Sequence, residues 1–269
     1  MLAASRAAPS SRGIHSQHFA FTQRLISPLL LLLAWELLCR TGVIPPQIIA
    51  APTSIGATFW HMLASGELAQ NLLISLLRVL KGMTISLTLG TALALIAGLS
   101  VRGELAIDAP VQMLRTLPFL ALVPLFIVWF GIGELTKVAL IAFGTVFPIY
   151  LTLYSGIRGI DARLIEAGTS FGLSRFELIR TVILPGALPS LLLGLRYSLG
   201  IAWLCLVVVE QINATAGIGY LVNSARDFLR TDIIVVCLLV YSLLGFGTDL
   251  LVRLVERYAL AWRPSFLRA

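Results

Sequence analysis

Six long apolar stretches, separated by short polar segments, set the pattern of this chain. Each approaches the roughly 20 mainly apolar residues that an α-helix needs to cross the hydrocarbon of a bilayer. The first stretch is the weakest, because it is short and contains Pro28 and Glu36. The pattern predicts an all-α integral membrane protein with six transmembrane helices. The predicted spans are 25–40, 82–100, 116–133, 138–157, 181–209 and 233–252.

The longest connection, 41–70, follows the first span. Pro45, Pro46 and Pro52 break any helix in its first half, because proline lacks an N–H group and restricts the residue before it. Apolar residues after Pro52 then recur at helical spacing, which predicts a short amphipathic helix at the outer membrane interface. The residues with this spacing are Ile55, Phe59, Met62 and Leu63.

The two ends of the chain are predicted to be cytoplasmic tails. The first 24 residues are rich in Ala, Ser and Arg and show no periodicity, which predicts a mobile segment. The apolar run that follows a basic start is also typical of a signal peptide. Because Glu36 interrupts that run and no small-residue cleavage site follows promptly, we expect it to be retained. The predicted regions are the tail 1–24, the first span 25–40, the outer connection 41–70, a core 71–256 with five spans, and the tail 257–269.

Composition agrees with a membrane protein and argues against other classes. Hydrophobic residues make up 58% of the chain and charged residues 12%, with a mean hydropathy of +0.93. Soluble domains are about half apolar and about a quarter charged. The net charge of +7 does not indicate nucleic-acid binding, because the arginines are spread between apolar spans. The three cysteines lie far apart without a CxxC pair, so neither disulfides nor a metal site is predicted.

Lys and Arg residues predict the orientation of the spans. Most of those outside the spans fall on the same side as the two termini. Because cytoplasmic connections carry an excess of Lys and Arg, we expect both termini in the cytoplasm. The connection 161–184, between the fourth and fifth spans, is then cytoplasmic as well.

That connection contains the signals of a helix–turn–helix. Asp161 is suited to cap a first helix, and Gly172 to end it in the left-handed conformation. Ser174 and Glu177 form the pattern of a capping box, which starts a second helix. We expect Pro185 to end the second helix and Pro189 to restart a helix that enters the membrane.

An apolar stripe runs along both of these predicted helices. It must be covered either by neighbouring loops of the same chain or by a partner subunit. The stripe consists of Leu164, Ala167 and Phe171 on the first helix, and Phe176, Ile179 and Ile183 on the second.

The same connection carries a family signature. Its Glu166-Ala167-Gly168, followed by Gly172 and Val182-Ile183-Leu184-Pro185, resembles the signature loop of permease subunits in bacterial ATP-binding-cassette importers. The chain is similar to the nitrate, sulfonate and taurine branch from about Trp35 to Arg263, and most similar to the aliphatic sulfonate permeases. Gly168 departs from the pattern, in which alanine is usual. Further resemblance lies in 112–118, 128–131, 147–150, 194–196, 202–203, 217–221 and 226–232.

The resemblance implies a fold, partners and roles. The fold would be the MetI-like importer-permease bundle, with coupling helices between spans four and five, in the bacterial inner membrane. Two copies would assemble with two ATPase subunits and a periplasmic or lipid-anchored substrate-binding protein, in contact with membrane lipid. ATP and Mg would bind to the ATPase, which leaves this chain non-catalytic and without a cofactor; the chain contains no GxxxxGK[ST] motif of its own.

Coupling to the ATPase would belong to a short set of residues in the connection. Glu166 would anchor it by charge, Gly172 would set its turn, and Leu184 with Pro185 would form a rigid exit. The implied coupling residues are Glu166, Ala167, Gly168, Gly172, Leu184 and Pro185.

Several residues within or beside the spans are candidates for the translocation path. Ionisable residues within a bilayer are functional candidates by default, although they also pair between helices. Arg196 is open to both interpretations, whereas Glu36 and Asp249 are expected to pair or reach the interface. Aromatic and glycine positions in the spans are expected to pack, with Gly90, Gly98, Gly194 and Gly200 at close helix contacts. The candidate path residues are Arg196, Trp203, Glu210, Arg78 and Trp129.

Arg78 and Lys81 precede the second span on its outer side. They could meet an anionic substrate or an acidic surface of the binding protein, or serve only as interface anchors.

The predicted function is ATP-driven import of aliphatic sulfonates, with taurine, nitrate or another small organic ion as alternatives. A more distant alternative is an ion-driven secondary transporter, but that class shows repeated halves, which this chain lacks. An intramembrane enzyme is disfavoured, because the predicted spans contain no histidine and the chain contains no HExxH motif.

Overall fold

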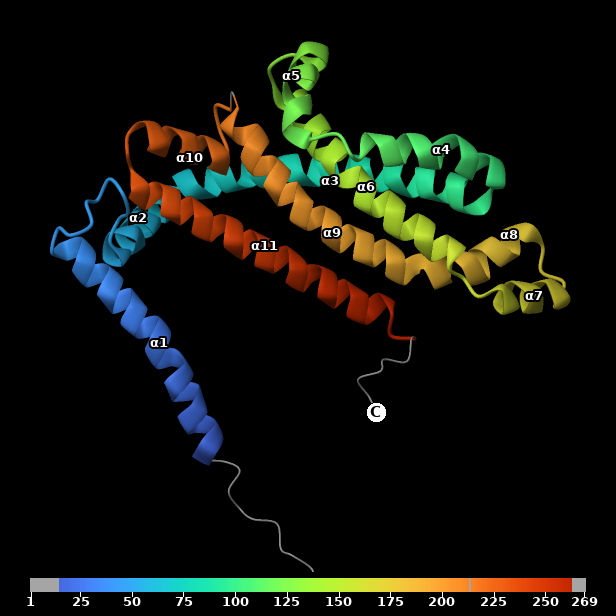
Figure 1. Ribbon diagram of the computed structural model, residues 1–269, viewed down its shortest axis with the longest axis horizontal. Helices are drawn as coiled ribbons and strands as arrows, with labels where there is room; N and C mark the ends of the chain where they lie inside the picture. Colours follow the sequence, from blue (N-terminus) through green and yellow to red (C-terminus); the bar gives the residue numbers. More distant parts are fainter. Residues whose placement is uncertain (1–14, 213, 263–269) are drawn as a thin grey trace, which may run out of the picture.

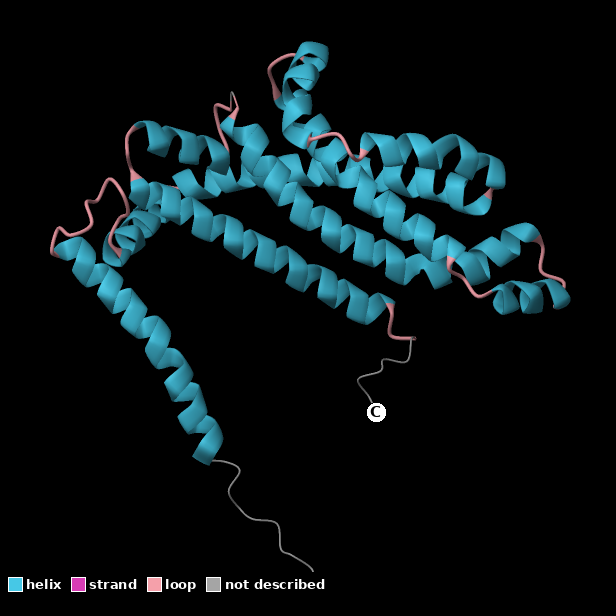
Figure 2. Ribbon diagram, viewed as in Figure 1, coloured by secondary structure: helices cyan, strands magenta, loops and turns pink. Residues whose placement is uncertain are grey.

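The computed structural model describes residues 15–212 and 214–262, and this part of the chain folds into helices and loops without a strand (Figure 2). The helices are α1 His15–Arg40, α2 Pro52–Ala64, α3 Glu67–Leu99, α4 Val101–Leu114, α5 Phe119–Phe130, α6 Glu134–Arg158, α7 Ala162–Ser170, α8 Arg175–Leu178, the π-helical turn η1 Ile179–Ile183, α9 Leu184–Gln211, α10 Ile218–Asp227 and α11 Thr231–Ala259. The predicted all-α class is therefore confirmed.

Four helices in the described residues are long and apolar enough to cross a membrane, and α4 with α5 counts as a fifth if the bent pair is one span. The four are α3, α6, the continuous helix Arg175–Gln211 and α11. The predicted third span, 116–133, is not one straight helix: α5 has only 12 residues and meets α4 at a bend of 104°. Pro118 lies at this bend, as the extended residue immediately before α5. The first predicted span lies in α1 and is not among these five, so the count of six stays a prediction.

The core of the bundle is formed by α3, α6 and α9, with α11 alongside (Figure 1). Gly82, Gly90 and Gly98, spaced eight residues apart, lie on α3 against an equally spaced row on α6. A Cβ atom added at these glycines would come within 2.6, 3.0 and 2.8 Å of the Cγ2 atoms of Ile141, Ile149 and Ile157. Small residues thus let two helix backbones approach closely, as is common between helices in membranes.

The predicted helix contacts at Gly90, Gly98 and Gly194 are confirmed, since a side chain at each would meet the neighbouring helix. The same prediction is wrong for Gly200, where nothing lies within 4 Å of an added Cβ atom. Helical spacing alone does not tell which face of α9 a glycine occupies.

The short helix predicted after Pro52 is present as α2, with Pro52 in its first turn. Its apolar residues Ile55 and Met62 are buried in a cluster with residues of α3, α10 and α11. Leu63 points away and remains 44% exposed. Most of the apolar face of α2 is therefore covered by the protein itself.

The two predicted tails differ from the structure in extent. The helix α1 begins at His15, so residues 15–24 are helical and do not form the predicted irregular tail. At the other end, α11 continues to Ala259. The calls on 1–14 and 263–269 lie outside the described residues. In Figure 1, α1 points away from the bundle, and it contacts the other helices mainly through α2.

Candidate functional site

The signature hairpin, residues 161–184, lies at one end of the bundle, and α2 and α10 lie at the other (Figure 1). Its first helix, α7, is capped as predicted: the carboxylate of Asp161 accepts a 2.9 Å hydrogen bond from the N–H of Arg163. After α7, Gly172 has φ +79°, which confirms the predicted left-handed stop. The N–H of Leu173 then donates to the carbonyl of Gly168, at 3.1 Å.

The second helix begins with the predicted capping box. The hydroxyl of Ser174 accepts a hydrogen bond from the N–H of Glu177, at 3.3 Å. The carboxylate of Glu177 in turn accepts from the N–H of Ser174 at 2.8 Å and from its hydroxyl at 2.7 Å. Both ends of the turn are thus fixed by local sequence.

The predicted end of this helix at Pro185 is wrong. The helix continues from Arg175 to Gln211, through the π-helical turn and past both Pro185 and Pro189. The N–H of Leu184 bonds to the carbonyl of Ile179, five residues back, which widens the helix just before Pro185. Such widening accommodates a residue that lacks an N–H and whose ring would clash in a regular turn. The hairpin is therefore joined to α9 by continuous helix.

Part of the apolar stripe on the hairpin is uncovered. Leu164, Phe171 and Phe176 are 56%, 88% and 72% exposed, whereas Ile183 is buried in the bundle. Glu166 is exposed beside them. Within the described residues, the chain's own loops therefore cover only the end of the stripe nearest the membrane helices.

Gly168, the departure from the family pattern, is buried where α7 crosses the following helix. A Cβ atom there would approach the Cδ1 atom of Leu178 to 2.6 Å. The neighbour is the mobile end of a leucine side chain, so an alanine could be accommodated by its rotation. This contact lies within the chain and involves no partner.

A second constellation, the buried charge cluster, consists of Ser75 and Arg78 of α3, Glu134 and Lys137 of α6, and Glu210 of α9. Arg78 is at its centre, with 4% of its side chain exposed. Its Nε and Nη2 atoms donate to the two carboxylate oxygens of Glu134, at 2.7 and 2.5 Å. Its Nη1 atom donates to Glu210 at 2.6 Å and to the carbonyl of Ala216 at 2.7 Å.

Glu210 joins α9 to three other helices. Its carboxylate, with no exposed side-chain surface, accepts hydrogen bonds from Arg78, from the hydroxyl of Ser75 at 2.7 Å and from the N–H of Gly219 at 2.8 Å. Tyr241 of α11 donates a longer bond at 3.4 Å. Because each of these partners compensates the burial of the charge, the cluster stabilises this end of the bundle only while it is complete.

The structure brings together two candidates that the sequence had left separate, Arg78 and Glu210. Arg78 is not an interface anchor, because it is buried among helices, whereas Lys81 is exposed. Glu134, Lys137 and Ser75 were not predicted. The opposite charges of Glu134 and Lys137, three residues apart at the start of α6, were the available signal.

Arg196 pairs with a neighbouring helix, which was one of its two predicted interpretations. Its Nε atom donates to Asp249 of α11 at 2.8 Å, and Asp249 also accepts from Arg253 at 2.7 Å. Glu36 pairs with Arg40 at 2.6 Å. Glu36 also accepts a hydrogen bond from the N–H of Thr53 of α2, at 3.0 Å. The expectation that Glu36 and Asp249 each pair with a neighbouring helix is therefore confirmed.

The two tryptophan candidates occupy different surroundings. Trp203 is buried and donates its indole N–H to the hydroxyl of Thr248 at 3.2 Å. Trp129 of α5 is 61% exposed and contacts the ring of Phe126. Packing is thus confirmed for Trp203, while most of the Trp129 side chain stays uncovered.

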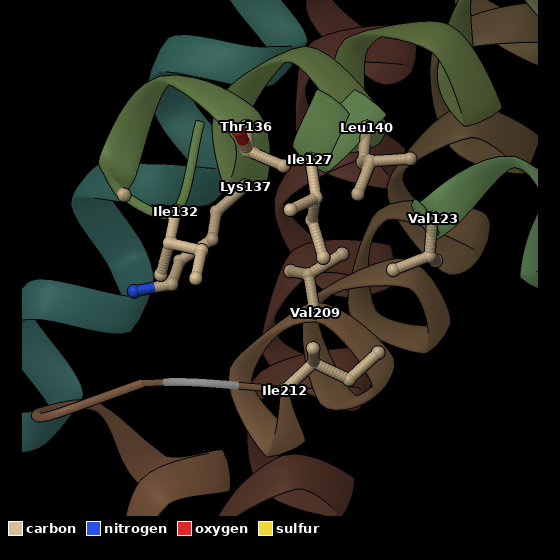
Figure 3. A pocket seen from close by; sticks show the side chains of 9 residues that line it. Val123, Ile127, Ile132, Thr136, Lys137, Leu140, Val209 and Ile212 are labelled. Atoms are coloured by element: carbon tan, nitrogen blue, oxygen red, sulfur yellow. The ribbon is translucent and has the colours of Figure 1, made fainter. Parts of the chain in front are cut away.

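A small apolar pocket adjoins the charge cluster (Figure 3). The stem of Lys137 forms one wall, and its nitrogen points away from the pocket toward α3 (Figure 3). The space measures about 20 Å³, enough for about one water-sized group. Its walls include Val123, Ile127, Ile132, Leu140, Val209 and Ile212. Among the described residues, no group of three or more His, Cys, Asp and Glu could hold a metal ion.

Comparison with known proteins gives consistent matches. Residues 86–259 match the family described as binding-protein-dependent transport system inner membrane component. The chain is 47% identical over 239 residues to SsuC of Escherichia coli (strain K12), whose name assigns it as an aliphatic sulfonates transport permease protein; the match covers 89% of this chain and 91% of the relative. It is 36% identical over 244 residues to the taurine transport system permease protein TauC of the same organism, covering 90% and 83%.

Solved structures give the same fold. An amino acid ABC transporter aligns with a TM-score of 0.61 at 19% identity, covering 74% of this chain and 98% of the other. The MetNI methionine ABC transporter in inward-facing conformations aligns with a TM-score of 0.57 at 18% identity, covering 71% and 97%.

Proposed function

The chain belongs to the family of inner membrane components of binding-protein-dependent transport systems, and we propose that it is the membrane-spanning subunit of an ATP-driven importer of aliphatic sulfonates. The substrate class follows from the relatives named for aliphatic sulfonates, at 47% and 40% identity over most of the chain. Taurine, an amino-substituted sulfonate, is the first alternative, since the taurine permease is 36% identical.

The observation that carries a coupled mechanism is the signature hairpin. It is capped at both helix starts, it exposes Phe171 and Phe176, and it continues as one helix into α9. Exposed aromatic side chains on a rigid support are what a docking surface requires. We propose that a cytoplasmic ATPase subunit binds this hairpin, with Glu166 and Gly172 at the contact and Leu184 and Pro185 where the hairpin leads into α9.

The rigid connection supplies the mechanical link. When ATP draws two ATPase subunits together, two hairpins approach each other, and α9 transmits the displacement because no flexible loop separates it from α8. The bundle then changes between two states that face opposite sides of the membrane, a population shift driven by differential binding. ATP and Mg bind to the ATPase in this scheme.

The assembly requires partners that complete the pathway. A second copy of the chain provides the other half of the translocation path, and a periplasmic or lipid-anchored binding protein delivers the substrate at the α10 end. Both termini then lie in the cytoplasm of a cell with this chain in its inner membrane. Among the candidate path residues, Arg196 and Trp129 keep exposed side-chain surface and are the ones expected at the path, whereas Trp203, Glu210 and Arg78 are buried within the bundle.

Sulfur-limited growth tests this function. A bacterial strain deleted for sulfonate import is complemented with this chain and with the ATPase and binding protein of the same importer, and is grown on ethanesulfonate, taurine or sulfate. Growth on ethanesulfonate that is lost when the ATPase is omitted supports the proposal. Transport of a sulfonate by liposomes that contain this chain alone would refute ATP-driven coupling, and growth on taurine only would reassign the substrate.

A further inference from the structure

One exposed carboxylate covers two buried cations in the charge cluster. The side chains of Arg78 and Lys137 are 4% and 7% exposed, whereas that of Glu134 is 60% exposed. Glu134 lies in the first turn of α6, where its side chain can rotate into solvent without burying its own charge. The cations have no such freedom, because they are enclosed by helices.

Three donors converge on this carboxylate from two helices. Nε and Nη2 of Arg78 lie 2.7 and 2.5 Å from the two oxygens of Glu134, and Nζ of Lys137 lies 3.1 Å from one of them. Two oxygens thus serve three donors, and one oxygen is shared. A head group with three oxygens would provide one for each donor.

Arg78 is held from behind, independently of Glu134. Its Nη1 atom is bound by Glu210 and by the carbonyl of Ala216. When Glu134 turns away, the guanidinium therefore keeps its place with two donors directed outward. Pre-organised donors of this kind bind an anion without a further ordering cost.

The charges of the cluster favour an incoming anion. Arg78 and Lys137 balance Glu134 and Glu210, so the closed cluster is neutral. Withdrawal of Glu134 leaves one uncompensated positive charge in a site that is otherwise enclosed. Leaving it unpaired is costly, and an anion from solvent would remove that cost.

We propose that Nε and Nη2 of Arg78 and Nζ of Lys137 form a binding site for the head group of an organic sulfonate, and that Glu134 occupies it as a tethered competitor. The substrate class rests on the proposed function. The three sulfonate oxygens match the three donors, and guanidinium forks bind such oxyanions in pairs. Glu134 and the substrate exchange places, so the site closes again once the anion leaves.

The apolar pocket beside the stem of Lys137 takes no part in this site. Lys137 is the only residue of the cluster that lines it, and the nitrogen of that lysine points away from it (Figure 3). Its space holds about one water-sized group, so the proposal rests on the three donors alone.

Removing the competitor tests the exchange. In the permease–ATPase complex in lipid nanodiscs, Glu134→Ala is expected to bind ethanesulfonate about tenfold more tightly than the wild type, because a tethered competitor acts at a high effective concentration. Titration calorimetry measures this. Ethanesulfonate at about ten times its Kd should also raise the melting temperature of the variant by about 3 °C relative to sodium chloride of equal ionic strength.

A matched control separates this site from any arginine that loses its carboxylate. Asp232 also binds an arginine through two oxygens, Arg230 at 3.0 and 2.7 Å, but that arginine is 54% exposed. Asp232→Asn should show no sulfonate-specific rise in melting temperature. Glu134→Gln keeps the shape of the side chain, so it tests the proposal even if the alanine variant does not fold. It should also bind ethanesulfonate more tightly than the wild type.

Failure of this inference can be told apart from failure of the proposed function. If the wild-type importer supports growth on ethanesulfonate but neither Glu134 variant binds it more tightly or is stabilised by it, the cluster is only structural and the inference is wrong. If the wild-type importer does not transport sulfonates at all, the proposed function fails, whatever the variants bind.

Discussion

The signature hairpin and the buried charge cluster are built in opposite ways. The hairpin is fixed by contacts between residues close in sequence, such as Ser174 with Glu177, and leaves Phe171 88% exposed. The cluster joins residues that are distant in sequence, Arg78 with Glu134 and Glu210, and buries Glu210 completely. A docking surface can form from contacts between neighbouring residues in the sequence, whereas a charge cluster between helices forms only when the whole bundle is assembled.

This contrast predicts different consequences of mutation. Changes in the cluster should reduce the free energy of unfolding, and changes on the face of the hairpin should leave it nearly unchanged while they disrupt coupling. The following variants test the contrast in order of decreasing effect on stability.

Glu210→Ala should have the largest effect. The change leaves the buried Arg78 with one carboxylate and removes the acceptor of the Gly219 N–H, and breaking a buried pair costs roughly 3–5 kcal/mol. Thermal melting in detergent, followed by circular dichroism, measures the loss. Glu210→Gln, which keeps the shape and several hydrogen bonds, should lose less. Equal melting temperatures for Glu210→Ala and the wild type would show that the cluster does not stabilise the bundle.

Gly172→Val should have the next largest effect and extends the contrast into the turn of the hairpin. A β-branched residue at φ +79° is strained, by about 1–2 kcal/mol. The matched control is Gly172→Asn, since asparagine tolerates this conformation better. Reduced co-purification of the ATPase with the valine variant, but not with the asparagine variant, is expected. If both bind the ATPase like the wild type, the left-handed turn is not needed for docking.

The hairpin and the charge cluster also differ in how much of their structure could be predicted from the sequence. Asp161, Gly172 and the capping box were predicted correctly, because caps and turns depend on a few neighbouring residues. The role of Glu134 was not found, because nothing near it in sequence indicates a partner on α3. The predicted break at Pro185 was wrong because a π-helical turn can absorb a proline, and the sequence carries no clear signal for such a turn.

The predicted spans differ in the same respect. The hydropathy pattern located α3, α6 and α11, since long apolar runs determine their own helices. It did not predict the 104° bend between α4 and α5, because Pro118 in the connection signals a helix boundary but not the angle between the two helices. The importer-permease fold itself was recognised from the signature residues, and the solved relatives have that fold.

Ser174→Ala should cost less than either change above. It removes the hydroxyl that accepts from Glu177, and loss of an N-cap typically costs about 1 kcal/mol. Because α8 has only four residues before the π-helical turn, we expect fraying of the hairpin rather than unfolding of the bundle. Hydrogen exchange measured by mass spectrometry should show faster exchange in 171–178 only. Ser174→Thr retains the cap and should exchange like the wild type; faster exchange throughout α9 would instead show that the hairpin and the bundle unfold together.

Glu166→Lys should have the smallest effect on stability and the most complete effect on coupling. Glu166 is exposed, and its side chain makes no hydrogen bond or ion pair within the described part of the chain. Its replacement should therefore change the free energy of unfolding by less than about 0.5 kcal/mol. Reversal of its charge at the proposed ATPase contact should nevertheless abolish both co-purification of the ATPase and sulfonate uptake. Arg163→Gln, a charge change one helical turn away on α7, serves as the matched control and should retain both. A Glu166→Lys protein that melts like the wild type and still binds the ATPase would contradict the proposed contact. The hairpin would then be a well-formed, exposed surface that is not the docking site of the ATPase.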